Sequence, residues 1–189
     1  MNTKAKPFIK WVGGKGQLIE QLEAKLPADF DNWDDATYIE PFVGGGAMLF
    51  YMLQQHPNIK RAVINDINSD LVTCYRTVRD NVEELIPALQ DIQAQYYALQ
   101  DMEAKREMFM AVRQRYNEKN LDPIENTAKF FFLNRKTMFH CSFSSLFSSH
   151  LSSEWSGFTR TTEAQATSGS PRPRITVCIC QSYDSVIEC

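Results

Sequence analysis

The sequence YIEPFVGGGAMLF, residues 38–50, predicts the end of a buried strand, a sharp turn with three glycines, and the start of a helix. Glycine permits positive φ and has no Cβ, so such a turn lets the first N–H groups of the helix approach a small polar or anionic ligand. The alternative is a flexible turn without a ligand. The apolar run before the glycines, and an acid about twenty residues after them, favour a ligand site.

That acid ends a second apolar run, Ala62-Val63-Ile64-Asn65-Asp66. The spacing is typical of a βαβ unit, in which the acid at the tip of the second strand, Asp66, accepts hydrogen bonds from a ribose. The two runs together predict a nucleoside cofactor. The dinucleotide fingerprint Gly-x-Gly-x-x-Gly is incomplete because Leu49 stands in place of its third glycine, which argues against a nicotinamide or flavin oxidoreductase.

Residues 6–17 contain another glycine turn, Gly13-Gly14-Lys15-Gly16, followed by a helical pattern. It is not a P-loop, because Ile9 occupies the position of the first glycine and no Ser or Thr follows Lys15. Lys15 offers a cation for a carboxylate, and Trp11 offers a flat face for a base or a sulfonium. The alternative is that Trp11 belongs to the core and Lys15 is solvated.

Three motifs, in this order and spacing, resemble those of the DNA adenine methylase family, the S-adenosylmethionine-dependent N6-adenine methyltransferases exemplified by the Dam enzymes. They are Lys10-Trp11-Val12-Gly13-Gly14-Lys15, Glu40-Pro41-Phe42-Val43-Gly44-Gly45-Gly46 and Asn65-Asp66-Ile67-Asn68-Ser69-Asp70-Leu71. The resemblance runs from about Lys6 to Arg135. It implies a site-specific DNA methyltransferase that transfers methyl from S-adenosylmethionine to adenine N6 in double-stranded DNA.

The resemblance also implies which residues bind the cofactor. Trp11 and Lys15 would border S-adenosylmethionine, and Asp66 would hold its ribose hydroxyls. The turn beneath the methionine part would be shaped by Pro41, Phe42, Gly44 and Gly46.

The predicted fold is α/β: a Rossmann-like S-adenosylmethionine-dependent methyltransferase core, an all-helical insertion and a C-terminal tail of low order. Residues 1–70 are assigned to the cofactor-binding half of the core. Residues 71–135 are assigned to a helical insertion that leads to the target-recognition region, and 136–189 to a family-unlike tail rich in serine and cysteine.

Apolar residues at helical spacing predict helices at 71–82, 85–99, 101–117 and 122–135. Asn68 or Ser69 would cap the first, and Asp122-Pro123 would start the last. Basic residues of this segment are candidates for contacts to DNA phosphates, and an ordinary solvated helix face is the alternative. They are Arg106, Arg113, Arg115, Lys119 and Arg135.

The net charge of −3 and the pI near 5.6 give no global signature of nucleic-acid binding, so any basic face is local or lies outside this chain. No apolar run approaches membrane-spanning length, and the N-terminus has no apolar secretory segment. Only Cys74 of the five cysteines precedes residue 140, so the well-patterned part is no disulfide scaffold. A cytoplasmic location is predicted. DNA and a restriction endonuclease of the same system are the expected partners.

The sequence changes character after Arg135. Residues 1–135 contain one serine, whereas residues 136–189 contain twelve serines and four of the five cysteines. Periodicity fades there, and residues 174–180 are the one stretch with the composition of a strand. No metal site is predicted, because Cys178 and Cys180 lack a spaced partner pair. The family resemblance implies a Thr-Cys-Phe-Asn-Gly-type turn, a β-hairpin and Asp-Pro-Pro-Tyr in this region, and none of these is present.

The missing Asp-Pro-Pro-Tyr motif would carry the transfer chemistry. The adenine N6 amine is a poor nucleophile because its lone pair is delocalised into the ring. The motif's Asp and first Pro carbonyl would accept its hydrogen bonds, and the Tyr would stack the flipped base. Asp122-Pro123 is the only Asp-Pro here, and Ile124-Glu125 follows it on a predicted helix. This chain is therefore expected to lack catalytic residues, and a non-catalytic cofactor- or DNA-binding remnant is the alternative function.

A slip of the reading frame near Lys136 would explain the change of character. Thr137-Met138-Phe139 is encoded by ACN-ATG-TTY, and reading one nucleotide later gives cysteine followed by a codon that can encode phenylalanine. Cys-Phe is the pair that the family carries just after Asn-Arg. Another frame of the same DNA is then predicted to encode the hairpin and Asp-Pro-Pro-Tyr, and a divergent insertion is the alternative.

Overall fold

The computed structural model describes residues 5–136 and the backbone of residues 174–178. The chain divides into two compact units, Met1–Val72 with Arg160–Cys189, and Thr73–Thr159. We call the described part of the first the sheet unit and that of the second the helical unit. The division falls within a single helix, α3 (Ser69–Asp80).

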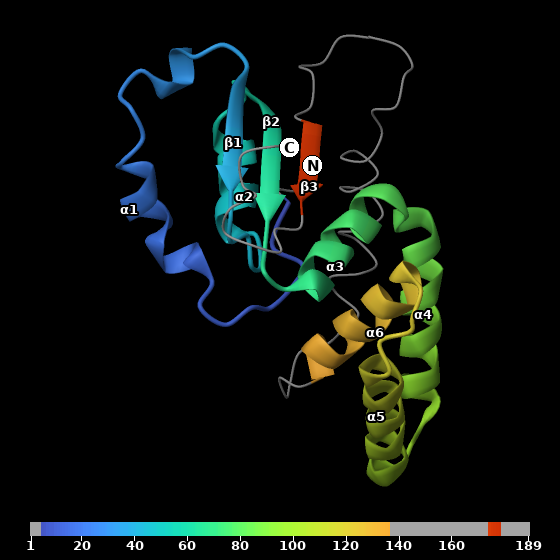
Figure 1. Cartoon of the computed structure of the whole chain (residues 1–189). Helices are drawn as coiled ribbons and strands as arrows, with labels where there is room; N and C mark the ends of the chain where they lie inside the picture. Colours follow the sequence, from blue (N-terminus) through green and yellow to red (C-terminus); the bar gives the residue numbers. More distant parts are fainter. Residues whose placement is uncertain (1–4, 137–173, 179–189) are drawn as a thin grey trace. The chain divides into compact units, whose positions relative to one another are not determined.

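The sheet unit is built on parallel strands in the order β1-β2-β3 (Figure 1). They are β1 (Ala36–Glu40), β2 (Ile59–Asn65) and β3 (Arg174–Cys178). The glycine turn and α2 (Ala47–Gln55) connect β1 to β2, and α2 lies behind these two strands in Figure 1. The βαβ arrangement predicted from the first two apolar runs, and with it the α/β fold, is confirmed.

The side chains that α2 and the strands bury explain why this segment folds as it does. Ala36, Met48, Met52 and Ile59 form a buried cluster between helix and sheet. Fully burying a methionine or isoleucine side chain stabilises the fold by about 1.5–3 kcal/mol. Because β1 and β2 are parallel, with Glu40 beside Ile64, their carboxyl ends meet at the same edge of the sheet.

The N-terminal segment contains shorter helices than its apolar pattern predicts. It forms a 3-10 turn η1 (Lys15–Leu18), one helical turn α1 (Ile19–Glu23) and a second 3-10 turn η2 (Phe30–Asn32). Leu18 and Leu22 remain partly exposed, while Ile19 and Leu26 pack on the buried cluster. The turn at residues 13–16 is therefore tied to the sheet unit by only part of the predicted apolar face.

The prediction of a low-order tail is wrong for Arg174–Cys178, which pair with β2 as β3. The strand predicted at 174–180 is confirmed for these five residues. The physical reason is that Ile175, Thr176 and Val177 are β-branched and suit a strand, and β2 would otherwise have an unpaired edge. The rest of the tail, from residue 137 onward, lies outside the described residues. The frame slip predicted near Lys136 concerns the coding DNA and stays a prediction.

Helices α4 (Val82–Ala98), α5 (Met102–Asn117) and α6 (Pro123–Lys136) follow α3, so the four predicted helices are confirmed. The starts of α3 and α6 follow the predicted capping. Asn68 Oδ1 accepts from the N–H groups of Asp70 and Leu71 at the start of α3. Asp122 Oδ1 accepts from two N–H groups in the first turn of α6.

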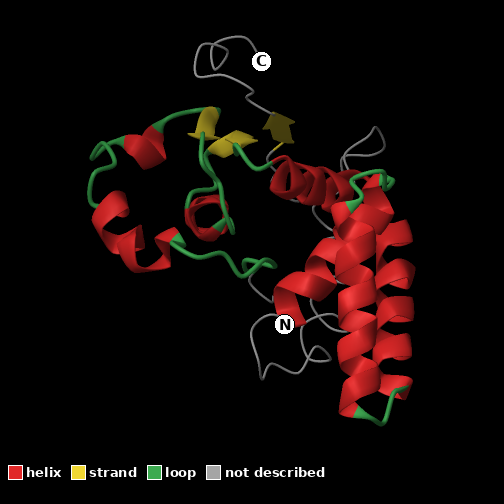
Figure 2. Cartoon of the chain, turned by 60° about the horizontal axis from the view of Figure 1, so that its bottom comes forward, coloured by secondary structure: helices red, strands yellow, loops and turns green. Residues whose placement is uncertain are grey.

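The helical unit has its own core, in which α6 packs against α4 and α5 (Figure 2). Ile92, Val112 and Phe132 are buried together. A buried hydroxyl pair links α3 to α6, since Thr127 Oγ1 donates to Thr77 Oγ1 at 3.1 Å. Among the residues described, no helix has the length and apolar character needed to cross a bilayer.

Candidate functional site

The predicted site residues of the sheet unit meet around one cavity of about 270 Å³. Three segments contribute: the glycine turn after residue 10, the carboxyl end of β1 with the glycine turn that follows it, and the tip of β2. The cavity is lined by Trp11, Val12, Gly13, Gly14, Lys15, Glu40, Phe42, Val43, Gly44, Gly45, Ala47 and Asp66. The structure therefore brings Trp11, Lys15 and Asp66 together, as the motif spacing predicts.

The turn between β1 and α2 needs glycine at two positions. Gly44 has φ +51° and Gly46 has φ +79°, which are left-handed values that other residues avoid. The Val43 N–H donates to Asn65 O at 2.9 Å, and the Gly46 N–H donates to Val43 O at 2.8 Å. These bonds hold the turn against the tip of β2 and direct the start of α2 toward the cavity.

Asp66 fixes the glycine turn in addition to lining the cavity. Its Oδ2 accepts from the Gly44 N–H at 2.9 Å, and its Oδ1 accepts from the Asn68 N–H at 3.0 Å. The residue is 7% exposed. Each oxygen of an ionised carboxylate accepts a second hydrogen bond, so Asp66 keeps the capacity to bind a hydroxyl pair.

Trp11 lies against the glycine turn and is not a core residue. Its side chain is 37% exposed. A Cβ added at Gly44 would be 3.1 Å from Trp11 Cδ1, and one added at Gly45 would be 3.0 Å from the carbonyl oxygen of Ile9. The close approach of these two segments requires glycine at both positions, and it leaves an aromatic surface at the edge of the cavity.

Lys15 has a partner within the protein. Its Nζ is 2.7 Å from Glu40 Oε1, and it also donates to the carbonyl oxygen of Phe42. The sequence predicted that Lys15 would offer a cation to a carboxylate, and in the structure that carboxylate belongs to Glu40, the acid at the end of β1. The cavity thus contains a matched cation and anion.

Glu40 lines the cavity, and the sequence analysis did not name it as a site residue. It is 4% exposed, and its second oxygen, Oε2, accepts from Tyr38 Oη at 3.0 Å. Burial raises the pKa of the Glu40 carboxyl, while Lys15, Tyr38 and the Leu49 N–H act to lower it. The signal was present: in the sequence an acid stands at the carboxyl end of the predicted strand, directly before the glycine turn.

Of the other residues predicted to shape the turn after β1, one lines the cavity and two do not. Phe42 lines the cavity with a side chain that is 55% exposed. Pro41 and Gly46 flank the cavity without being among its lining residues. Pro41 O accepts from Asn65 Nδ2 at 3.2 Å, and Gly46 is the N-cap of α2. Their contribution is to the shape of the turn.

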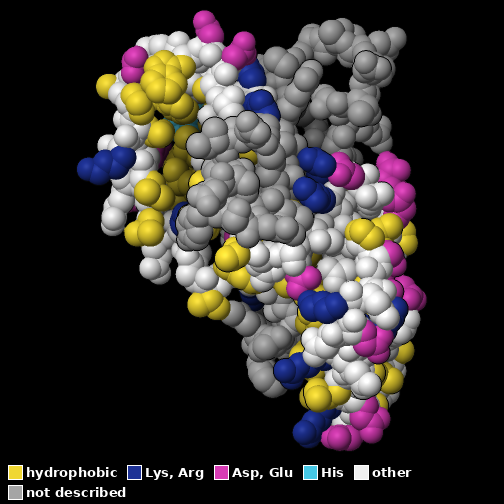
Figure 3. Space-filling view, in the orientation of Figure 1, with side chains coloured by type: hydrophobic (Ala, Val, Ile, Leu, Met, Phe, Trp, Pro, Cys, Tyr) yellow, Lys and Arg dark blue, Asp and Glu magenta, His cyan; other side chains and the backbone are white. Residues whose placement is uncertain are grey.

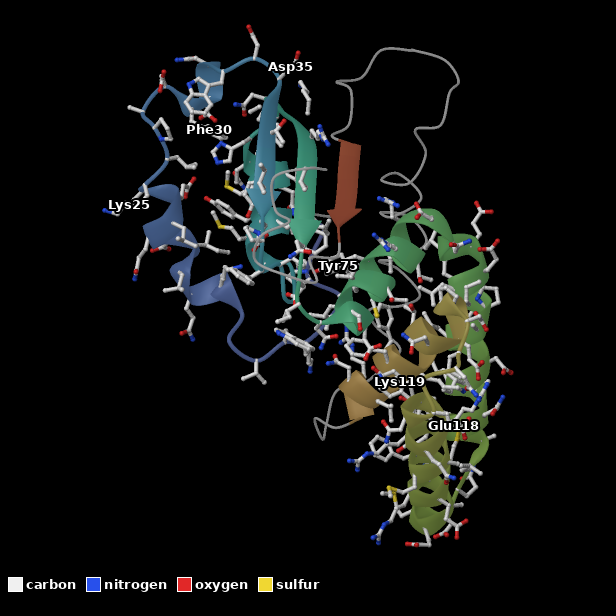
Figure 4. The ribbon with its side chains drawn as sticks, in the orientation of Figure 1. Lys25, Phe30, Asp35, Tyr75, Glu118 and Lys119 are labelled. Atoms are coloured by element: carbon white, nitrogen blue, oxygen red, sulfur yellow. The ribbon has the colours of Figure 1, made fainter. Side chains whose placement is uncertain are left out.

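The basic residues of the helical unit do not form a uniform basic surface. Arg115 bonds to Glu118, Asn120 and Glu125. Lys119 Nζ lies 4.1 Å from the centre of the Tyr116 ring, next to Glu118 at the end of α5 (Figure 4). Over α4–α6, Figure 3 shows basic and acidic side chains interleaved.

Two of the other basic candidates are exposed. Arg113 is exposed and makes no ion pair with another residue in the described range 5–136. Arg106 lies 4.0 Å from Glu103, with its side chain 76% exposed. Arg135 lies near the end of α6 and is partly buried. Arg113 is consequently an exposed basic candidate that no described acid pairs with.

Within the described part of the chain, no three His, Cys, Asp or Glu side chains come close enough to hold a metal ion. The cavity is instead lined by one ion pair, one further carboxylate, backbone, small apolar side chains and two aromatic residues, Trp11 and Phe42. These groups suit an organic ligand with charged and hydroxyl groups.

Residues 11–148 match the family described as D12 class N6 adenine-specific DNA methyltransferase. The match extends past Arg135, so the prediction of a family-unlike sequence from residue 136 onward is wrong for residues 136–148. It includes all three segments that line the cavity.

Individual relatives agree. The chain is 41% identical to the type II methyltransferase M.MjaIII of Methanocaldococcus jannaschii over 134 aligned residues. These residues make up 70% of this chain and 46% of that protein. It is 33% identical to the type II methyltransferase M1.LlaDCHI of Lactococcus lactis subsp. cremoris, over 69% of this chain and 40% of that protein. It is 29% identical to the DNA adenine methylase of Escherichia coli K12, over 70% of this chain and 41% of that protein.

The chain thus matches less than half the length of these curated relatives. The family match nevertheless spans most of this chain and coincides with the cavity-forming motifs. The chain belongs to the D12 class N6 adenine-specific DNA methyltransferase family.

Proposed function

We propose that this chain binds S-adenosylmethionine in the cavity of the sheet unit, as the cofactor-binding part of a DNA adenine N6-methyltransferase. The observation that carries the proposal is that Trp11, Lys15 and Asp66, from three separate motifs, line one cavity beside the glycine turn. The cavity is slightly smaller than the roughly 300–1,000 Å³ typical of ligand sites. Part of the cofactor would therefore lie at its open side.

The charges of the cavity match those of the amino-acid end of the cofactor. S-adenosylmethionine carries an α-ammonium and an α-carboxylate, and the cavity contains Glu40 and Lys15. The ligand ammonium would pair with Glu40 and the ligand carboxylate with Lys15, so that each protein charge exchanges one partner for another. Charge-assisted hydrogen bonds of this kind are the strong ones.

The remaining lining residues suit the nucleoside end. The two oxygens of Asp66 would accept hydrogen bonds from the ribose hydroxyls, while the N–H groups of Gly44 and Asn68 keep them in place. The exposed face of Trp11 would contact the adenine or the sulfonium. Pro41, Phe42, Gly44 and Gly46 would shape the turn beneath the methionine part. When bound, the cofactor supplies an electrophilic methyl group on its sulfonium.

The proposed domain organisation follows the sequence assignment. Residues 1–70 would form the cofactor-binding half of a Rossmann-like core, and 71–135 a helical insertion leading to the region that recognises DNA. Residues after 148, where the family match ends, would form the family-unlike tail. Double-stranded DNA is the proposed substrate, the cytoplasm the proposed location, and a restriction endonuclease of the same system a proposed partner, as the names of the type II relatives suggest.

Methyl transfer by the 189-residue chain alone is not expected, because its sequence contains no Asp-Pro-Pro-Tyr. The acceptors that would localise the lone pair of the adenine amine are then absent. A second candidate function, a binding module without activity, rests on this same observation.

Calorimetric titration of the purified chain tests the proposal. We expect S-adenosylmethionine to bind and NAD not to bind. Asp66→Ala should weaken binding at least tenfold, while Asp80→Ala, which removes an exposed acid at the end of α3, should leave it unchanged. Binding of NAD in preference to S-adenosylmethionine, or equal effects of the two substitutions, would contradict the proposal. Methylation of an adenine-containing duplex by the chain would exclude the binding-module alternative.

A further inference from the structure

Tyr38 supports Glu40 from behind the cavity. The two residues are separated by one position on β1, so their side chains lie on the same face of the sheet. Tyr38 Oη donates to Glu40 Oε2 at 3.0 Å. Tyr38 is partly buried and is not among the residues that line the cavity. Its hydroxyl therefore contacts the carboxylate from the protein side and leaves the cavity side open.

The two oxygens of Glu40 have different neighbours. Oε2 bonds to Tyr38, which is fixed within the strand, whereas Oε1 pairs with Lys15, whose side chain is 34% exposed. A buried carboxylate with fewer donors would be expensive to keep ionised. Burial, the charge of Glu40 and the hydrogen bond to it raise the pKa of the Tyr38 hydroxyl, so that it stays protonated and acts as a donor.

Ligand binding at this site requires an exchange of partners at Oε1. If the ammonium of a ligand takes the place of Lys15 on Glu40, two contacts from the described residues persist through the exchange: the Tyr38 hydroxyl on Oε2 and the backbone N–H of Leu49. Rotation of the Glu40 carboxylate during the exchange would break the bond from Tyr38. Tyr38 thus resists the rotation and keeps Oε1 directed into the cavity.

We propose that Tyr38 is a positioning residue that orients Glu40 and thereby gives the site its preference for nucleoside ligands with an α-amino-acid end. This inference rests on the proposed function. It adds to it that recognition of the amino-acid end depends on a residue outside the cavity.

The test compares two ligands and two matched variants. S-adenosylmethionine has the amino-acid end, whereas 5′-methylthioadenosine shares its nucleoside part and lacks that end. Tyr38→Phe removes the hydroxyl that reaches Glu40. Tyr51→Phe is the control, because Tyr51 Oη donates to Glu23 in the same unit and neither residue lines the cavity.

We expect Tyr38→Phe to weaken S-adenosylmethionine binding about tenfold, the effect of losing one hydrogen bond to a charged group, and to leave 5′-methylthioadenosine unchanged. Loss of S-adenosylmethionine binding at low pH should also begin at a higher pH in this variant. Tyr51→Phe should change neither ligand.

Equal weakening of both ligands by Tyr38→Phe, or no weakening of either, would overturn the inference. Wild-type binding that is equally tight for the two ligands would also overturn it, while leaving a nucleoside-binding function intact. A wild-type chain that binds neither ligand would instead refute the proposed function itself.

Discussion

Gly44→Ala tests whether the glycine turn and Trp11 form one rigid wall of the cavity. Gly44 has φ +51°, and a Cβ at this position would be 3.1 Å from Trp11 Cδ1. The substitution therefore introduces two separate penalties, one in the backbone and one in the contact with the indole. Substitutions at two other glycines of the sheet unit, Gly13 and Gly16, allow the two penalties to be measured separately.

The magnitudes follow from the local geometry. An alanine in the left-handed region costs about 1–2 kcal/mol. Gly13, at φ +78° with no atom within 4 Å of its added Cβ, carries this penalty alone. At Gly44 the indole must also shift, which adds about 1 kcal/mol of overpacking, so we expect a loss of about 2–3 kcal/mol. Gly16→Ala, with ordinary φ and open space, should be neutral or slightly stabilising, by up to about 1 kcal/mol.

Urea denaturation followed by tryptophan fluorescence and circular dichroism measures the free energy of unfolding of each variant. The expected order of stability is Gly16→Ala, then Gly13→Ala, then Gly44→Ala. The difference between the last two measures the contact with Trp11. If Gly44→Ala is no less stable than Gly13→Ala, the indole of Trp11 does not pack on the glycine turn, and the two do not form one wall of the cavity.

Removal of one partner of the ion pair should make stability depend more steeply on pH. Burial already raises the pKa of Glu40 above its unfolded value, so the contribution of this group to stability falls as the pH rises through the raised pKa. Lys15→Met removes the cation that lowers the Glu40 pKa, so it raises that pKa further. The variant should lose about 1–2 kcal/mol of unfolding free energy at neutral pH, a figure discounted for the partial exposure of Lys15, and little near pH 4. Urea midpoints that fall equally at both pH values would contradict this. Arg113→Ala should weaken binding to duplex DNA and lower the slope of log affinity against log salt concentration by about one. Arg115→Ala, which breaks bonds to Glu118 and Glu125, should mainly lower stability. Filter-binding and melting experiments that gave the DNA effect to Arg115 and the stability effect to Arg113 would contradict this.

Local sequence chemistry was enough to predict the βαβ unit at the site and the starts of two helices. Asn68 and Asp122 precede helical patterns and bond to the first N–H groups of α3 and α6. The glycine turn and Asp66 follow apolar runs at a spacing that suits a βαβ unit, and parallel pairing brings them to one edge. Each of these features depends on residues within about thirty positions of one another, which is why pattern and spacing were sufficient.

The pairing of Lys15 with Glu40 could not be predicted in the same way. A lysine on a glycine turn can be solvated, bind a ligand or pair with any nearby acid, and the choice depends on the exact course of the chain. The Tyr38 hydroxyl is a similar case, because its partner is decided by the rotamer of Glu40. Pairing of Arg174–Cys178 with β2 joins residues more than one hundred positions apart, for which local composition gives no register.

An NMR titration of the isotope-labelled chain with S-adenosylmethionine tests most directly whether the cofactor binds at the glycine turn. The informative signals are the indole N–H of Trp11 and the backbone N–H groups of Gly44 and Asn68, which donate to Asp66. We predict that these three signals are among those that shift most. Shifts confined to the helical unit, or none at saturating ligand, would contradict a cofactor site at the glycine turn.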